Sequence, residues 1–300
     1  MVYIKVSMIG ATIKLNDGRT IPQLGLGVWQ IPAGKKCEAA VLTAFEAGYR
    51  HVDTASFYGN EESVGAAVRA SGIPREEIFV TTKLWNSDHS NPERAFETSL
   101  GKLKLDFIDL YLIHYPVPAR LRSWRAFEKL KEQGKVRSIG VSNFTIRHLT
   151  ELLAQTDIVP AVNQVEFHPY LYQRELLDFC GTRGIVIEAY SPLTQGHRLK
   201  DSKLVAIAKK YATVLSPSGQ RKKFPFLSSV SRSADTKSTA QILIRWAIQH
   251  HLVVIPKSAN ASRIRENADV FDFEITDEDM RTLDGFNENL RTCWDPSNAP

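Results

Sequence analysis

Short apolar runs alternate with amphipathic stretches along most of this chain. Eight of the runs have the length and nearly continuous apolar character of strands that are covered on both faces. In the stretches between them, apolar residues return at helical spacing, as Val41, Leu42 and Phe45 do within residues 37–47. The alternation predicts a parallel sheet with helical crossovers. Its strands are expected at residues 24–28, 49–54, 78–82, 107–113, 136–141, 161–165, 185–189 and 252–255.

Capping residues mark several helix boundaries. A helix over residues 92–103 begins at an Asn-Pro pair, which is a cap followed by proline at the first helical position. Another helix, over residues 123–133, ends before Gly134. Thr276, with Asp279 three residues later, predicts one more helix start near the end of the chain.

Eight strand-and-helix units predict a single domain, a (β/α)8 TIM barrel that spans residues 1–300. Before the first strand, residues 11–24 have the pattern of a β-hairpin with Asp17 and Gly18 in its turn. We expect this N-terminal hairpin to close the bottom of the barrel.

One segment does not follow the repeating pattern. Residues 213–235 hold six serines and two prolines, without sustained periodicity, between two helix-like stretches. They lengthen the interval between the strand ends at Tyr190 and Lys257, where the other intervals each fit one strand and one helix. We predict an irregular, exposed insertion there that carries no catalytic groups.

Composition and charge exclude several classes of protein. The chain has 300 residues, 43% of them hydrophobic, and a net charge of +5 without a basic stripe interleaved with aromatic residues. No apolar run reaches the roughly 18 residues that span a bilayer, and the N-terminus lacks the pattern of a secretory leader. The three cysteines are far apart in the sequence, which indicates a reducing compartment. Their spacing does not match that of metal ligands. We expect a cytoplasmic monomer without metal, nucleic-acid or membrane partners.

The candidate chemistry lies at the strand ends, because active sites of such barrels are at the C-terminal face. Asp53, Lys83 and His114 end the second, third and fourth predicted strands, and Tyr58 follows on the next loop. Each residue alone has a simpler explanation: a helix cap, a solvated charge, a core histidine. Four such groups meeting at one mouth favour catalysis.

The chain resembles the aldo-keto reductases, of the microbial aldose and aldehyde reductase type, over nearly its whole length. The resemblance is carried, in order, by GYRHVDTASFYGNE, KLWNSDH, LIHYP, GKVRSIGVSNF, AVNQVEFHPYL, AYSPL and IPKS. It implies that Asp53, Tyr58, Lys83 and His114 form the family's catalytic tetrad. Tyr58 would donate a proton to a carbonyl that hydride reduces. Lys83 would lower the pKa of Tyr58, Asp53 would hold Lys83, and His114 would orient the carbonyl.

The resemblance also implies NADPH as the cofactor, although no Rossmann glycine fingerprint is present. Ser142, Asn143 and Gln164 would hold the nicotinamide carboxamide. Tyr190 would stack on the ring. The remaining cofactor contacts expected are Ser191 and Leu193 in the 191–199 loop at the pyrophosphate, Lys257, Ser258 and Arg263 at the 2′-phosphate, Glu266 and Asn267 at the adenine, and Asn260. Independently of the resemblance, the segment IPKSANASRIREN holds two cations and a hydroxyl group, which suit a phosphate.

An aromatic substrate pocket would be formed by Trp29, Phe57, Trp85 and Tyr115, with the tail RTCWDPSNAP folded over it. Such a pocket predicts small aldehydes and ketones as substrates, but it does not identify one compound among them. Two other functions stay open: a regulatory or structural barrel that binds NADP(H) without turnover, and a phosphate-binding isomerase or aldolase. The complete tetrad argues against both.

Overall fold

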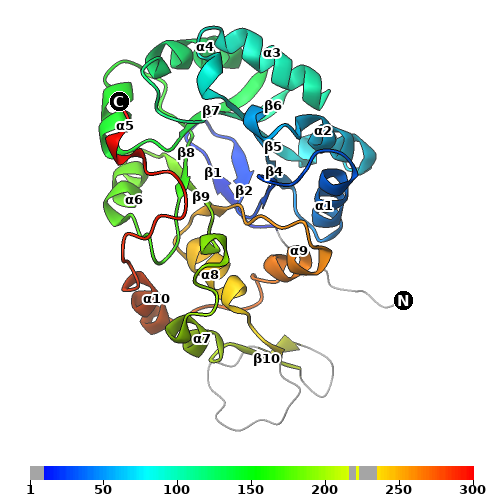
Figure 1. Cartoon of the computed structure of the whole chain (residues 1–300), viewed down its shortest axis with the longest axis vertical. Coiled ribbons are helices and arrows are strands. Elements are labelled where there is room, and N and C mark those ends of the chain that lie inside the picture. The colour runs from blue at the N-terminus through cyan, green and yellow to red at the C-terminus, as the bar shows by residue number, and fades with distance from the viewer. Residues whose placement is uncertain (1–9, 216–220, 223–234) are drawn as a thin grey trace.

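Eight parallel strands close into a barrel in the computed structural model, which describes residues 10–215, 221–222 and 235–300 (Figure 1). Neighbouring strands pair in chain order, and Leu24 bridges Val254 and Gly27 bridges Lys257 to join the first strand to the last. The predicted (β/α)8 barrel is confirmed. Its strands are β3 (Leu26–Gly27), β4 (His51–Asp53), β5 (Phe79–Leu84), β6 (Ile108–Ile113), β7 (Val136–Ser142), β8 (Val162–Glu166), β9 (Val186–Tyr190) and β13 (Val253–Val254).

Helices surround this barrel. The predicted helix over residues 92–103 is α3 in full, and the side chain of Asn91 accepts a hydrogen bond from the Arg94 amide at its start. The helix expected over 123–133 begins three residues earlier, at Arg120, and Thr276 caps the last helix through the Asp279 amide. The helices are α1 (Lys35–Glu46), α2 (Glu61–Ala70), α3 (Pro92–Leu103), α4 (Arg120–Glu132), α5 (Ile146–Leu153), α6 (Arg174–Gly181), α7 (Ser202–Ala208), α8 (Thr239–Gln249), α9 (Ala261–Ala268) and α10 (Asp277–Asp284). Within the described ranges, none has the length and apolar character to cross a membrane.

The N-terminal hairpin closes the end of the barrel at which the strands begin. Its strands, β1 (Thr12–Lys14) and β2 (Thr20–Pro22), pair antiparallel. Gly18 takes the left-handed conformation that the turn needs, with φ 87°, and its amide donates to the Leu15 carbonyl. Leu15 and Ile21 are buried in an inner cluster with Leu110, Leu112 and other strand residues. In Figure 1 the hairpin lies across the centre of the barrel, as the sequence predicts.

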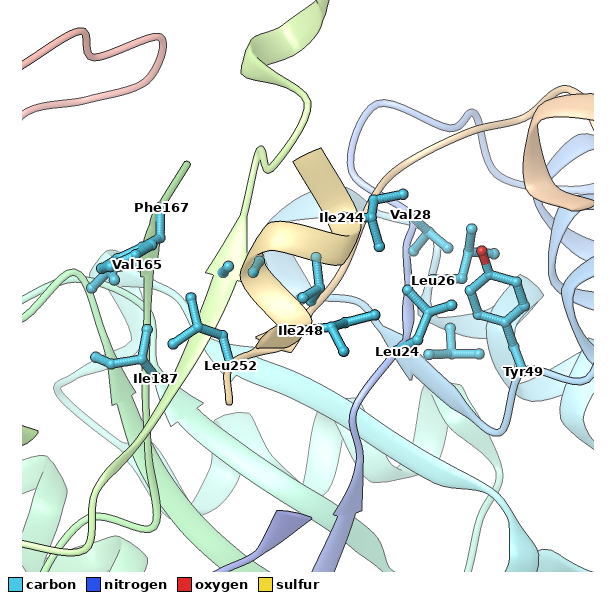
Figure 2. Packing of buried hydrophobic residues seen from close by; sticks show 14 of the residues in the cluster. Leu24, Leu26, Val28, Tyr49, Val165, Phe167, Ile187, Ile244, Ile248 and Leu252 are labelled. Atoms are coloured by element: carbon cyan, nitrogen blue, oxygen red, sulfur yellow. The ribbon is translucent and has the colours of Figure 1, made fainter. Parts of the chain in front are cut away.

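Helix α8 supplies much of the core on the side where the barrel closes. Its buried Ile244 and Ile248 lie between the first strand and the segment that enters the last strand (Figure 2). Each such side chain contributes about 1.5–3 kcal/mol by leaving water. This packing fixes the positions of the loops that follow β9 and β13. The other residues labelled there are Leu24, Leu26, Val28, Tyr49, Val165, Phe167, Ile187 and Leu252.

The ends of the predicted insertion leave the barrel together between α7 and α8. Strand β10 (Ala212–Leu215) pairs antiparallel with β12 (Asp235–Thr236) and with β11 (Arg221–Lys222). The sequence did not predict this short ladder, because a serine-rich run carries no strand periodicity. Residues 216–220 and 223–234 lie outside the described residues, so the irregular insertion at 213–235 stays a prediction.

Candidate active site

A cavity of about 1040 Å³ opens at the C-terminal ends of the strands. Residues from the strand ends, from the loop after β9, from the start of α9 and from the C-terminal tail all line it. Three of the four tetrad residues face it, and Lys83 lies beneath them. Every predicted cofactor contact also lines this cavity: Ser142, Asn143, Gln164, Tyr190, Ser191, Leu193, Lys257, Ser258, Asn260, Arg263, Glu266 and Asn267.

A buried ion pair forms the floor of the cavity at one end. Lys83 is fully buried, and its Nζ donates to both carboxylate oxygens of Asp53, at 2.7 and 2.8 Å, and to the Thr54 carbonyl at 2.8 Å. Asp53 ends β4 and Lys83 is near the end of β5, and these two strands pair in parallel register. Burying either charge alone would cost several kcal/mol, so folding itself brings the two together.

Tyr58 lies directly above this ion pair. It ends the short turn η1 (Ser56–Tyr58) after β4, where Gly59 takes a left-handed conformation. Its hydroxyl is 3.5 Å from Lys83 Nζ. Burial raises the pKa of Tyr58 well above its usual range, and the Asp53 charge acts in the same direction. The expectation that Lys83 favours the ionised form of Tyr58 stays a prediction, since the Lys83 charge is also paired with Asp53.

His114 completes the group at the end of β6. Burial, and secondly the Lys83 charge, lower the pKa of His114 well below its usual value, so its imidazole is neutral. The ring stacks on Tyr115 with centroids 4.9 Å apart and meets Tyr58 edge-on at 5.8 Å. Its Nδ1 is buried and has no hydrogen-bond partner among the residues described. A neutral imidazole here has one N–H to give and no charge of its own.

Asn143 organises the next part of the cavity wall. This residue has a positive φ of 63°, and its amide nitrogen donates to the His114 carbonyl at 2.9 Å and to Ser142 Oγ at 3.1 Å. Its amide oxygen accepts from the Tyr190 hydroxyl at 2.8 Å. The Tyr190 ring is thereby held in one orientation along the wall, as a stacking platform requires.

Gln164 joins this wall to the ion pair. Its amide nitrogen donates to Asp53 Oδ2 at 2.8 Å and to Glu188 Oε2 at 3.0 Å. The sequence argument did not name Glu188, which is fully buried on β9. A signal was present, because Glu188 is two residues before Tyr190 and successive side chains alternate between the two faces of a strand. A carboxylate at such a position in an apolar strand faces the barrel interior.

The other end of the cavity, around the start of α9, has free cations. Asn260 caps α9 through the Arg263 amide at 3.0 Å, and Ser258 Oγ accepts from the Asn260 amide at 3.1 Å. Lys257 and Arg263 are exposed. Neither the Lys257 ammonium nor the Arg263 guanidinium has a partner within the part of the chain that the structure describes. Cations that fold without a counter-charge suit an anionic ligand such as a phosphate.

The predicted substrate pocket is only partly as expected. Trp29, Phe57 and Tyr115 line the cavity, and Trp29 and Phe57 remain 37% and 55% exposed. Trp85 does not line it. Its ring is stacked behind Phe57, with centroids 3.8 Å apart, and meets His114 and Tyr115 edge-on. Trp85 therefore supports the wall from behind.

The C-terminal tail folds over the same side, as predicted. Trp294 contacts Tyr115 edge-on at 4.9 Å. The buried carboxylate of Glu166, at the end of β8, anchors the tail by accepting from the backbone amides of Thr292 at 2.8 Å and Cys293 at 3.2 Å. Sequence reasoning missed Glu166, although it shares a strand face with Gln164. Because of this anchor, Trp294 is a fixed part of the wall.

Together these groups can donate a proton to a ligand and hold an anion at a distance from that donor. The described ranges contain no group of three or more His, Cys, Asp or Glu side chains that could hold a metal ion.

Comparisons with known proteins show what the chain as a whole is similar to. The model of the aldo/keto reductase family matches residues 23–288. The glyoxal reductase of Bacillus subtilis (strain 168) is 45% identical over 288 residues, which cover 95% of this chain and 96% of that protein. The methylglyoxal reductase DkgA of Yersinia pestis is 45% identical over 289 residues, covering 95% of each. A crystal structure of a Bombyx mori aldo-keto reductase in complex with NADP matches with a TM-score of 0.82 and 39% identity, over 97% of each chain.

Proposed function

Because this chain belongs to the aldo/keto reductase family, which uses NADP(H), we propose that it reduces small aldehydes and ketones to alcohols with NADPH. The observation that carries the proposal is the contact of Tyr58 Oη with Lys83 Nζ at 3.5 Å, above the Lys83–Asp53 ion pair and inside the shared cavity. A barrel that only binds a nucleotide has no need of a buried lysine beneath a phenol.

The residues present fit NADPH at both ends of the cavity. The cations of Lys257 and Arg263, which have no partner among the described residues, suit its 2′-phosphate, which NADH lacks. Near the tetrad, Asn143 holds the Tyr190 hydroxyl, so Tyr190 would lie against the nicotinamide ring, and Gln164, which lines the cavity, would face the carboxamide. When bound, NADPH supplies the hydride.

Tyr58 supplies the proton. Burial keeps its phenol protonated at neutral pH, so it holds the proton that the alcohol oxygen needs. As that proton leaves, negative charge appears on Tyr58 Oη beside the ammonium of Lys83, which stabilises it. Asp53 keeps Lys83 in place through two hydrogen bonds, and solvent later returns the proton to Tyr58.

His114 positions the carbonyl. Since its imidazole is neutral, it donates one N–H to the carbonyl oxygen without competing as an acid. Trp29, Phe57, Tyr115 and Trp294 enclose the rest of a small substrate with aromatic surface. This wall offers no charged group to select one substrate, which supports a broad range of small carbonyl compounds. Because two relatives of this chain are a glyoxal reductase and a methylglyoxal reductase, glyoxal and methylglyoxal are the first compounds to try.

The test is NADPH consumption by the purified protein with glyoxal, methylglyoxal and a series of larger aldehydes and ketones. We expect turnover with several of them and a higher kcat/KM with NADPH than with NADH. Tight NADPH binding without turnover of any compound would instead favour the regulatory or structural barrel. Isomerisation or cleavage of a phosphorylated sugar without NADPH would instead favour the phosphate-binding isomerase or aldolase. The same preparation on a sizing column tests the expected monomer.

A further inference from the structure

Glu188 is a fully buried carboxyl group that the proposed reaction does not use. It lies on β9, one step further into the barrel than Tyr190 on the same face of the strand. Its Oε2 accepts a hydrogen bond from Gln164 Nε2 at 3.0 Å. Its Oε1 has no hydrogen-bond partner among the described residues, and His51 Nε2 lies 3.5 Å from it.

The groups around Glu188 determine whether it carries charge. Strand β4 presents His51 and Asp53, β5 presents Thr81 and Lys83, and β8 presents Gln164. Burial, and then the Lys83 charge, lower the pKa of His51 to about 3, so His51 is neutral. Lys83 is thus the one cation in the group, and Asp53 already pairs with it.

A second buried carboxylate would leave one negative charge without a counter-charge. Burial, and secondly the Asp53 charge, raise the pKa of Glu188 to about 8, so it is mostly protonated at neutral pH. On the other side of His51, the imidazole fills the room left by Gly25, where an added Cβ would lie 2.5 Å from His51 Nδ1. The fully buried Glu188 carboxyl therefore acts as a neutral acceptor for the Gln164 amide.

This arrangement fixes the orientation of the Gln164 amide. Both hydrogens of its nitrogen are donated, one to Asp53 and one to Glu188. Gln164 also lines the cavity, and its amide oxygen is the atom that remains to meet a ligand. A carbonyl oxygen accepts hydrogen bonds and cannot donate them, so it selects a ligand group that carries N–H.

We propose that Glu188 is a positioning residue: by holding the Gln164 amide nitrogen, it turns the Gln164 carbonyl oxygen toward the cavity, where it accepts a hydrogen bond from the carboxamide NH2 of nicotinamide. This inference rests on the proposed use of NADPH. Without Glu188, one amide hydrogen of Gln164 loses its partner, and the amide can rotate to present its nitrogen instead. The carboxamide would then be held less firmly, while the phosphates and adenine would be unaffected.

The experiment compares the affinities of Glu188→Leu and of the wild type for two compounds. The first is NADP+, and the second is 2′-phospho-ADP-ribose, which keeps the phosphates, riboses and adenine but lacks nicotinamide. A neutral hydrogen bond contributes about 0.5–1.5 kcal/mol, so we expect NADP+ binding to weaken roughly 2- to 13-fold. Binding of the nicotinamide-free compound should not change.

Two further variants sharpen the test. Glu188→Gln keeps an acceptor oxygen for Gln164 without a titratable proton, and we expect it to bind both compounds within about twofold of the wild type. Thr81→Val removes a polar group at the same depth that does not contact Gln164, and it should also bind both normally. If Glu188→Leu does not fold, Glu188→Met takes its place, because it keeps the side-chain length and offers no comparable acceptor.

The outcomes separate the proposals. A selective loss of NADP+ affinity in Glu188→Leu, with rescue in Glu188→Gln, supports the positioning role. Equal losses for both compounds, no loss in either, or a selective loss in Glu188→Gln would overturn it. Binding needs no turnover, so an inactive NADP(H)-binding protein would still give the expected pattern, and the proposed function would fail alone in the NADPH-consumption assay. A wild type that binds neither compound would overturn both.

A second readout is independent of rate. With NADPH deuterated at one or the other C4 position, the wild type should transfer label from one position only. A loosened carboxamide in Glu188→Leu should allow measurable transfer from both. Strict transfer from a single position in that variant would count against the positioning role.

Discussion

The two ends of the cavity are built in opposite ways. At the tetrad end, polar groups are buried and bonded to one another: Lys83 to Asp53, Asp53 to Gln164, Gln164 to Glu188. At the α9 end, Lys257 and Arg263 are exposed, and their charged groups have no partner in the described part of the chain. One end is complete before any ligand arrives, and the other end leaves its charges for the ligand.

Physical chemistry gives the reason for the difference. A buried charge must be paired when the chain folds, since an unpaired one costs several kcal/mol. An exposed cation is already hydrated and can exchange water for a phosphate at little cost. We therefore expect the buried end to orient groups for reaction and the exposed end to contribute affinity and the choice of nucleotide. Substitutions should separate these two contributions.

The largest expected effect is that of Tyr58→Phe. Removing the proton donor should lower kcat about 10²- to 10⁴-fold, the scale of general acid catalysis, and leave NADPH affinity nearly unchanged. Steady-state kinetics and fluorescence titration with NADPH measure the two quantities. Tyr115→Phe is the matched control, because Tyr115 also lines the cavity but has no contact with Lys83, and its kcat should stay within about threefold of the wild type. Near-normal turnover by Tyr58→Phe would remove Tyr58 from the reaction.

Lys83→Met tests the buried end through stability as well as rate. It leaves the Asp53 charge buried without its cation, which should lower the free energy of unfolding by about 3–5 kcal/mol. Denaturant melts measure this loss. The double variant Lys83→Met/Asp53→Asn should recover a large part of it, since no charge is then left unpaired. A single variant as stable as the wild type would show that the ion pair is not needed for folding.

At the exposed end, Arg263→Ala should act on binding alone. A charge-assisted hydrogen bond to phosphate contributes about 1.5–3 kcal/mol, which corresponds to a loss of NADPH affinity of roughly 10- to 100-fold. Affinity for NADH should hardly change, and stability should not. Arg265→Ala is the control, because Arg265 lies on the same helix but pairs with Glu46. Equal losses for NADPH and NADH would make Arg263 a structural residue.

The smallest effect is a dependence of stability on pH that comes from the buried end. The pKa of Glu188 is raised to about 8 in the folded chain, against about 4.3 in the unfolded chain. The folded state therefore holds a proton that the unfolded state has lost, and stability falls as pH rises toward 8.

The pKa is lowered in four histidines, which raise stability with pH only up to about 6.5: His51, His89, His114 and His148. Between pH 7 and 8 we expect the free energy of unfolding to drop by about 1 kcal/mol. Denaturant melts at the two pH values measure the drop, and Glu188→Gln should abolish it. A stability of the wild type that rises across this interval would mean that Glu188 is ionised at neutral pH.

The sequence predicted the barrel, its hairpin and the location of the site because position along a strand carries that information. A polar residue at the C-terminal end of a parallel strand must lie at the mouth, wherever the chain leads next. Asp53, Lys83 and His114 were identifiable for this reason, and Tyr58 through the family motif that surrounds it.

The features of the site that we did not predict depend on which side chains meet across the barrel. Trp85 is at a strand end, yet Phe57 stacks in front of it and takes its place on the wall. Glu188 and Glu166 contact partners on other strands or on the tail, which no local pattern reveals. The raised pKa of Tyr58 follows first from its burial, which depends on the folded surroundings of the phenol and not on its neighbours in the sequence. Roles for these residues remain predictions that the substitutions above test.

We expect the buried end to perform the chemistry and the exposed end to bind the nucleotide, independently of each other. A double-mutant cycle of Tyr58→Phe and Arg263→Ala, read as kcat/KM for NADPH, tests this most directly. Independent sites give effects that add in free energy within about 0.5 kcal/mol. We therefore expect the fold-loss in the double variant to be the product of the two single fold-losses. A coupling free energy above about 1 kcal/mol would contradict it, because the two ends would then act as one unit.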